Sequence, residues 1–138
     1  MKKKVMLLIC TMMVAIGLCA CGGVKELSEN FDEAAVKAAA EELVGYVNDG
    51  NAEGFCSVPM SDAMAENMTV ESTQQIFDEY LGNKGAFIEY NSITVVGADD
   101  KTIGDCAVVI VSAKYENMNV QYTISYDKDM NLVGFFLK

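Results

Sequence analysis

The spacing of the hydrophobic residues changes once along this chain, and that change sets the fold class. Before Gly85, apolar side chains recur every three or four residues, as they do on one face of a helix. After Gly85 they alternate with polar residues, as they do in a strand with one buried face. A chain with its helices first and its strands second is predicted to be an α+β domain, in which helices cover one face of an antiparallel sheet.

Three helices are predicted in the first half of the chain. The first extends from Ser28 to Asp49, because Asn30 and Glu33 have the spacing of a capping box and Gly50 is a typical residue after a helix end. One or two turns are expected at residues 52–57, followed by short helices at 62–67 and 70–81.

Four strands, joined in order by short turns, are predicted in the second half. The alternation of the first strand changes phase between Tyr90 and Ile93, which indicates a β-bulge there. The second strand is apolar on both faces, which is typical of a strand covered from both sides. In the last strand Val133, Phe135 and Leu137 are expected to share a face. The predicted strands cover residues 87–96, 106–115, 120–127 and 132–137.

The first 21 residues have the pattern of a lipoprotein signal peptide. Three lysines precede an apolar run of 14 residues from Val5 to Leu18, which is too short to span a bilayer comfortably. The segment Leu18-Cys19-Ala20-Cys21 resembles the bacterial lipobox, with an aliphatic residue three places before the lipidated cysteine and a small residue directly before it. The resemblance implies that residues 1–20 are removed and that Cys21 carries a diacylglycerol, together with a further acyl chain such as palmitate.

Lipidation at Cys21 would place the mature chain on the outer face of the cell membrane, because two or more acyl chains give stable anchoring. Cys19 is a poorer site, since the bulky Leu18 precedes it. The alternatives are an ordinary cleaved signal peptide and an uncleaved anchor. The predicted organisation is a signal peptide at 1–20, the lipidated cysteine and a short flexible tether at 21–29, and one domain at 30–138.

The composition excludes several classes of function. There are 20 acidic residues, ten lysines and no arginine, and removal of the signal peptide would leave seven lysines and a net charge of −13. Nucleic acid is therefore not an expected partner, because phosphate binding needs clustered basic residues. The absence of histidine excludes Ser-His-Asp and Cys-His nucleophiles and His-ligated metals. No spacing indicates an acid–base pair, so no catalytic residue, metal or cofactor is predicted.

Two cysteines remain in the mature chain if Cys21 is lipidated. A bridge between Cys56 and Cys106 is permitted outside the cytoplasm, and it would close a loop of about 50 residues. The alternative is two separate thiols that serve as small apolar side chains.

The segment from Asp127 to Asn131 has the D-x-D-x-N start of a calcium loop. It lacks the glycine at the sixth position and the glutamate at the twelfth that such a loop needs. A solvated hairpin turn is therefore the favoured interpretation.

A set of aromatic side chains is expected to gather between the helices and the sheet. Inward tyrosines could line a cavity that is open at one end, with their hydroxyls available to a ligand. The alternative is that these side chains fill the core. The candidate lining residues are Phe77, Tyr80, Tyr90, Tyr115, Tyr122, Tyr126 and Phe135, with Phe55 beside them.

Four short motifs carry a resemblance to a known family. They are the helix end at 47–50, the helix start at 68–71, the strand start at 85–87 and the hairpin at 127–134. Between residues 36 and 136 the chain resembles bacterial domain-of-unknown-function family 3887. The element order also looks like the nuclear transport factor 2-like, or cystatin-like, cone, with three N-terminal helices packed on a bent four-stranded antiparallel sheet. The resemblance implies a secreted or lipid-anchored protein and no defined activity.

Together these features predict a lipid-anchored, non-catalytic module that binds an unknown small molecule or an envelope protein. One alternative is a homodimeric or accessory envelope subunit that uses the outer sheet face, and another is a small acid–base enzyme in the cone. A tyrosine-lined cavity would favour ligand binding, whereas a filled core with an apolar outer sheet face would favour assembly.

Overall fold

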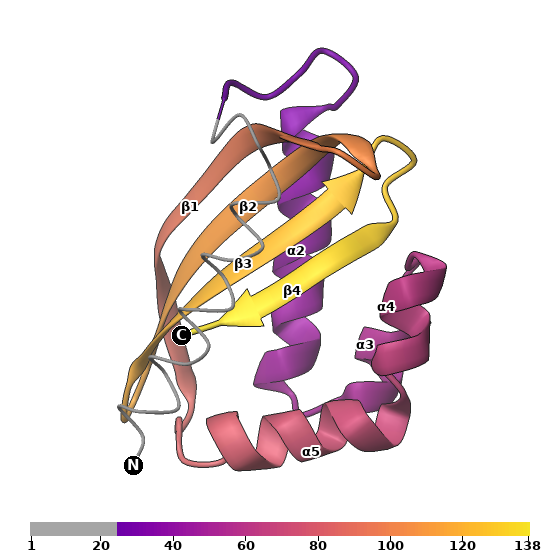
Figure 1. Ribbon diagram of the computed structural model, residues 1–138. Coiled ribbons are helices and arrows are strands. Elements are labelled where there is room, and N and C mark those ends of the chain that lie inside the picture. The colour runs from indigo at the N-terminus through magenta and orange to yellow at the C-terminus, as the bar shows by residue number, and fades with distance from the viewer. Residues whose placement is uncertain (1–24) are drawn as a thin grey trace.

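The computed structural model, which describes residues 25–138, has four helices followed by one antiparallel sheet (Figure 1). This confirms the α+β class and the order of helices before strands. None of the helices described is long and apolar enough to cross a membrane. The helices are α2 (Glu33–Asn48), α3 (Ala52–Ser57), α4 (Asp62–Asn67) and α5 (Val70–Leu81), and the strands are β1 (Phe87–Asp100), β2 (Gly104–Tyr115), β3 (Asn119–Asp127) and β4 (Leu132–Leu137), in the spatial order β1-β2-β3-β4.

Helix α2 lies across one face of the sheet (Figure 1), which we call the inner face. Its apolar residues recur at three- and four-residue spacing and therefore form one stripe along the helix. Ala40 in this stripe is completely buried, and its small side chain allows the helix backbone to approach the strands closely. The buried residues of α2 are Val36, Ala40, Leu43, Val44 and Val47.

The start of α2 differs from the prediction. The N-cap is Asp32, whose side chain accepts hydrogen bonds from the backbone N–H groups of Ala34 (2.9 Å) and Ala35 (3.3 Å). The predicted capping box of Asn30 and Glu33 is wrong, because the Asn30 side chain instead donates to a carboxylate far along the chain, Asp105 (3.0 Å). A tertiary contact has replaced the local one.

The turns expected at residues 52–57 form a helix of their own, α3, so the described residues contain four helices and not the predicted three. The Asn51 side chain caps α3 by accepting a hydrogen bond from the backbone of Gly54 (2.9 Å). Phe55 anchors it: this side chain is fully buried and packs edge-on against Phe77 of α5 and Phe135 of β4, with ring centroids 5.6 Å and 4.9 Å apart.

The β1–β2 hairpin is longer than predicted. The two strands pair as far as Asp100 and Gly104, so the turn occupies only residues 101–103. The Asp100 carboxylate accepts hydrogen bonds from the backbone of Thr102 (2.8 Å) and Ile103 (3.0 Å), which shapes this turn. The predicted β-bulge is confirmed, because the register shifts between Tyr90 and Ser92.

Alternating residues of the central strands face the core. In β2 the inward residues are buried, whereas Val108 and Ile110 on the outer face are partly exposed. Residues 25–138 therefore cover β2 fully on its inner face only, and not on both faces as predicted. The pairing of β4 with β3 shifts by one residue, since Ser125 pairs with Gly134 and Tyr126 with Leu132. As a result Leu132 is fully buried, at the end of β4 where Val133 was expected to face the core. The inward residues of β2 and β3 are Ala107, Val109, Val111, Ala113, Tyr115, Val120, Tyr122, Ile124 and Tyr126.

Candidate functional site

The segment before α2 is bound to the edge of the sheet. The backbone N–H of Lys25 donates to the carbonyl of Gly97 in β1 (2.9 Å), and the N–H of Gly97 donates to the carbonyl of Lys25 (2.8 Å). This pair of bonds is a one-residue antiparallel bridge. The predicted flexible tether is therefore wrong from Lys25 onward, where the chain is held against β1.

The bridge requires a glycine at position 97. A Cβ atom there would lie 2.5 Å from the backbone carbonyl oxygen of Glu26, a contact that no side-chain rotation relieves. An isolated glycine within a strand often marks a close approach of another backbone segment, and Gly97 does so here.

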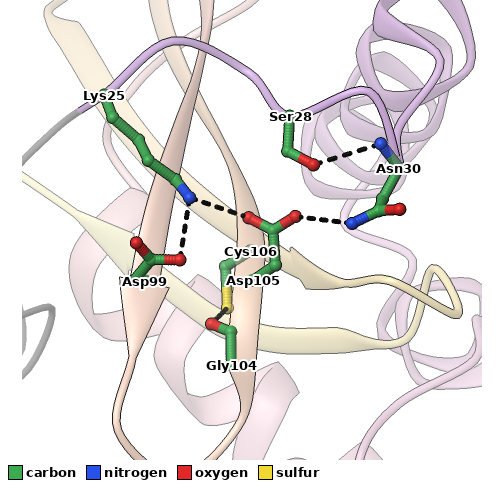
Figure 2. A network of polar contacts seen from close by, with 7 residues as sticks. All are labelled: Lys25, Ser28, Asn30, Asp99, Gly104, Asp105 and Cys106. Carbon is green, nitrogen blue, oxygen red and sulfur yellow. Dashed lines mark hydrogen bonds and ion pairs between the residues drawn. The ribbon is translucent and has the colours of Figure 1, made fainter.

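The Lys25 side chain lies between two carboxylates (Figure 2). Its Nζ is 2.8 Å from Oδ1 of Asp99 and 3.2 Å from Oδ1 of Asp105. The two aspartates are direct cross-strand partners, so their like charges would repel each other without a cation between them. The Lys25 ammonium therefore offsets this repulsion near the end of the β1–β2 hairpin.

The segment before α2 supplies one further donor to the Asp105 carboxylate. Asn30 Nδ2 donates to Oδ2 of Asp105 (3.0 Å), and the Ser28 hydroxyl accepts from the Asn30 backbone N–H (3.1 Å) (Figure 2). We call Lys25, Ser28, Asn30, Asp99 and Asp105 the Lys25 cluster. The cluster joins the segment before α2, residues 25–32, which we call the entry segment, to both strands of the β1–β2 hairpin.

The electrostatics follow this geometry. Hydrogen bonds from the side chains of Ser28 and Asn30, together with Lys25, hold the pKa of Asp105 below its ordinary value of 3.8. The hydrogen bond to Asp99 raises the pKa of Lys25 above its ordinary value of 10.5, with Asp105 adding to the effect. Lys25 and Asp105 therefore both carry their charges near neutral pH.

These shifts predict when the entry segment detaches. The contribution of Asp105 is present above pH 3.8 and is lost as the pH falls through its lowered pKa, whereas that of Lys25 is present below pH 10.5 and is lost as the pH rises through its raised pKa. Protection of the Gly97 amide against hydrogen exchange is expected to be highest between these limits. A Lys25→Gln variant should show lower protection at neutral pH, and equal protection in both proteins would contradict the role of the ion pairs.

The structure does not join the two cysteines. Both thiols are free: Cys56 Sγ donates to the Met68 carbonyl (3.1 Å) and lies 3.3 Å from Thr73 Oγ1, while Cys106 is buried on the outer face of β2. Of the two alternatives, the separate thiols are found and the bridge is not, because α3 packs on the inner face of the sheet, on the other side from Cys106. Burial and the surrounding aspartates, Asp100 foremost, raise the pKa of the Cys106 thiol to about 11, so this thiol is unreactive at neutral pH. Cys21 lies outside the described residues.

Most of the predicted aromatic set packs into the core. Phe77, Tyr115, Tyr122 and Tyr126 are buried, Tyr90 and Phe135 pack against them, and Tyr80 is exposed on α5, apart from the others.

The hydroxyls of Tyr115 and Tyr122 are paired within the protein. Tyr115 Oη donates to Oδ1 of Asn48 (2.5 Å) and shares a hydrogen bond with Tyr122 Oη (2.8 Å). These hydroxyls satisfy one another, as the filled-core alternative expects.

The Asp127–Asn131 segment forms the expected hairpin turn. Asp127 Oδ1 accepts hydrogen bonds from the backbone N–H groups of Asp129 and Asn131 (both 2.9 Å), so the carboxylate is occupied by its own turn. Among the residues that the structure describes, no group of three or more cysteine or acidic side chains is arranged to hold a metal ion.

The Lys25 cluster is the feature that the sequence analysis missed. Asp99 and Asp105 fall between the first two predicted strands, and Lys25 falls in the predicted tether. The isolated Gly97 after an apolar run was the signal that could have revealed the contact.

Comparison with known proteins gives a family and a similar structure. Residues 40–135 match the profile described as "Protein of unknown function (DUF3887)". The fold is similar to the NMR structure of a protein from Ruminococcus gnavus ATCC 29149, with a TM-score of 0.67 and 31% sequence identity over 81% of this chain and 96% of that chain. No curated protein matches the sequence.

Proposed function

Since the chain belongs to the DUF3887 family of proteins of unknown function, its role has to be argued from its own residues, and we propose that it is a lipid-anchored, non-catalytic domain on the outer face of the cell membrane. Its lipid would be attached to Cys21, in the sequence that resembles a lipobox. The domain would bind an envelope protein or a small molecule there.

One observation carries this proposal. Lys25 stands only four residues after Cys21, and its backbone is hydrogen-bonded to Gly97. When the folded domain begins so soon after the lipidation site, the lipid holds the domain close to the membrane. We also propose that the helices and bent sheet are a nuclear transport factor 2-like, or cystatin-like, cone, on the basis of the element order.

The arrangement of the tyrosines supports a non-catalytic role. A general acid or base needs a pKa near the working pH and access to a substrate. Burial raises the pKa of Tyr115 to about 12 and raises that of Tyr122 further, and the two hydroxyls bond each other. Neither group is suited to proton transfer at neutral pH.

An assembly role is a second candidate, because the outer sheet face is partly apolar. Val96, Val108, Ile110 and Phe136 lie on this face, outside the core cluster. Non-denaturing mass spectrometry distinguishes the two roles: a retained small molecule favours ligand binding, and a doubled mass favours a homodimer through the outer face.

The lipid anchor is tested by Cys21→Ser in cells that express the full chain. Wild type is expected to enter the detergent phase and to carry the added mass of a lipid on its N-terminal peptide. The Cys21→Ser variant has no thiol to acylate at this position, so its N-terminal peptide should lack the added mass, whether or not the apolar leader is removed. Cys19→Ser is the matched control and should carry the same added mass as wild type. An N-terminal peptide of wild type without the lipid mass, or one of Cys21→Ser with it, would overturn the lipoprotein assignment.

A further inference from the structure

The length of chain between Cys21 and the domain limits how far the domain can lie from its lipid. Four residues span at most about 14 Å when fully extended. Lys25 is the first described residue that is fixed to the domain, because its backbone is hydrogen-bonded to β1 and its side chain pairs with Asp99 and Asp105. One sheet edge is therefore kept close to wherever Cys21 is anchored.

The bridge also determines which end of the domain is close. Gly97 lies three residues before the end of β1. The start of α2 and the β1–β2 turn lie at this end of the domain, whereas α5 and the start of β1 lie at the opposite end (Figure 1). We call the first the Lys25 end.

An exposed apolar side chain is present at the Lys25 end. Ile103 is 43% exposed in the β1–β2 turn, next to the exposed Thr102 and two positions after Lys101. The other large apolar side chains that are exposed, among the described residues, are Val70 and Tyr80 on α5 and Ile88 at the start of β1, all away from the Lys25 end.

We propose that the domain is held in one orientation on the membrane, with the β1–β2 turn toward the bilayer and Ile103 in the lipid headgroup region. This inference rests on the lipidation of Cys21 proposed above. A branched apolar side chain beside a lysine suits the membrane interface, where the apolar part enters the lipid and the ammonium stays at the surface. In this orientation α5 points away from the membrane and is available to a partner.

The charges at the Lys25 end determine which lipid headgroups it can approach. The β3–β4 turn lies at this end too, because Asp127 is paired with Cys106 next to Asp105. The aspartates of the two turns and of the Lys25 cluster, Asp99, Asp100, Asp105, Asp127 and Asp129, outnumber the lysines Lys25, Lys101 and Lys128, so the Lys25 end is acidic. Anionic headgroups would repel these carboxylates. The contact is therefore expected to be clearest on zwitterionic phosphatidylcholine.

The chain contains no tryptophan, so one introduced tryptophan reports its own surroundings. The full lipidated protein would carry either Ile103→Trp or Tyr80→Trp, at positions that are similarly exposed, 43% and 38%. Each protein is reconstituted in phosphatidylcholine vesicles with and without brominated acyl chains, which quench tryptophan on contact. The emission of Ile103→Trp is expected to shift to the blue and to fall by about half or more, and that of Tyr80→Trp to stay unchanged.

The outcomes separate this inference from the anchor itself. A protein that floats with the vesicles but shows no quenching at position 103, or stronger quenching at position 80, overturns the orientation and leaves the anchor intact. A protein that neither floats nor carries a lipid overturns both proposals.

A second variant tests the cause of the orientation. Gly97→Ala cannot form the Lys25 bridge, because its Cβ would collide with the Glu26 carbonyl. Combined with Ile103→Trp, it should float with the vesicles and lose most of the quenching. Undiminished quenching would show that the bridge does not orient the domain and would overturn the inference.

Discussion

Replacing Phe55 with alanine is expected to lower the free energy of unfolding by about 3–5 kcal/mol. The Phe55 ring is fully buried and makes edge-on contacts with Phe77 and Phe135, so its loss leaves a cavity between α3, α5 and β4. Helix α3 has only six residues and is too short to be stable without this packing.

Urea unfolding followed by circular dichroism measures this change. Ile88→Ala is the control, because Ile88 is 51% exposed and its truncation is expected to change the free energy by less than about 0.5 kcal/mol. Similar losses in the two variants would contradict the central position of Phe55 in the core.

The domain is expected to unfold cooperatively in alkali. Burial raises the pKa of Tyr115 to about 12, and it raises the pKa values of Tyr122 and Tyr126 further above the ordinary value of 10.0. Above pH 10 the unfolded chain releases these protons and the folded domain keeps them, so the free energy of unfolding falls by about 1.4 kcal/mol per pH unit for each tyrosine.

For the three tyrosines together this is about 4 kcal/mol per pH unit. A domain with a stability near the lower end of the usual range of about 5–15 kcal/mol would unfold within about two pH units above 10. Half of the six tyrosines should then ionise in the same step as the sheet is lost, which tyrosinate absorbance and circular dichroism recorded together would detect.

Tyr122→Phe is the control for this prediction. The variant keeps the ring and removes one ionisable hydroxyl, while Tyr115 keeps its hydrogen bond to Asn48. Its alkaline transition should be less steep with pH and release one proton fewer. Gradual ionisation of all tyrosines below the unfolding transition would show that the hydroxyls are accessible to water.

Much of the fold could be predicted because its signals are local. The three- and four-residue spacing of apolar residues identified α2, which buries Leu43, Val44 and Val47, and the helix predicted at 70–81 has the bounds of α5. The phase change after Tyr90 located a β-bulge. In each case the side chains that carry the signal lie within one helix face or one strand.

The errors arose where distant residues compete with local ones. Asn30 could cap a helix locally, but in the folded chain it bonds Asp105, 75 residues away. Leu132, and not Val133, is buried at the start of β4 because the pairing of β4 with β3 shifts by one residue there. The separation of Cys56 from Cys106 likewise depends on which sheet face each cysteine occupies.

By itself, the sequence determined the α+β class, the acidic character and the exclusion of histidine chemistry, because these depend on composition and on periodicity within short segments. Only the tertiary structure decided that the segment after the lipobox-like sequence is bound to β1. That contact needs Gly97, Asp99 and Asp105 brought beside Lys25 by the β1–β2 hairpin. Gly97 marks one side of this contact in the sequence, but only the folded chain identifies its partner, because Lys25 lies more than 70 positions away.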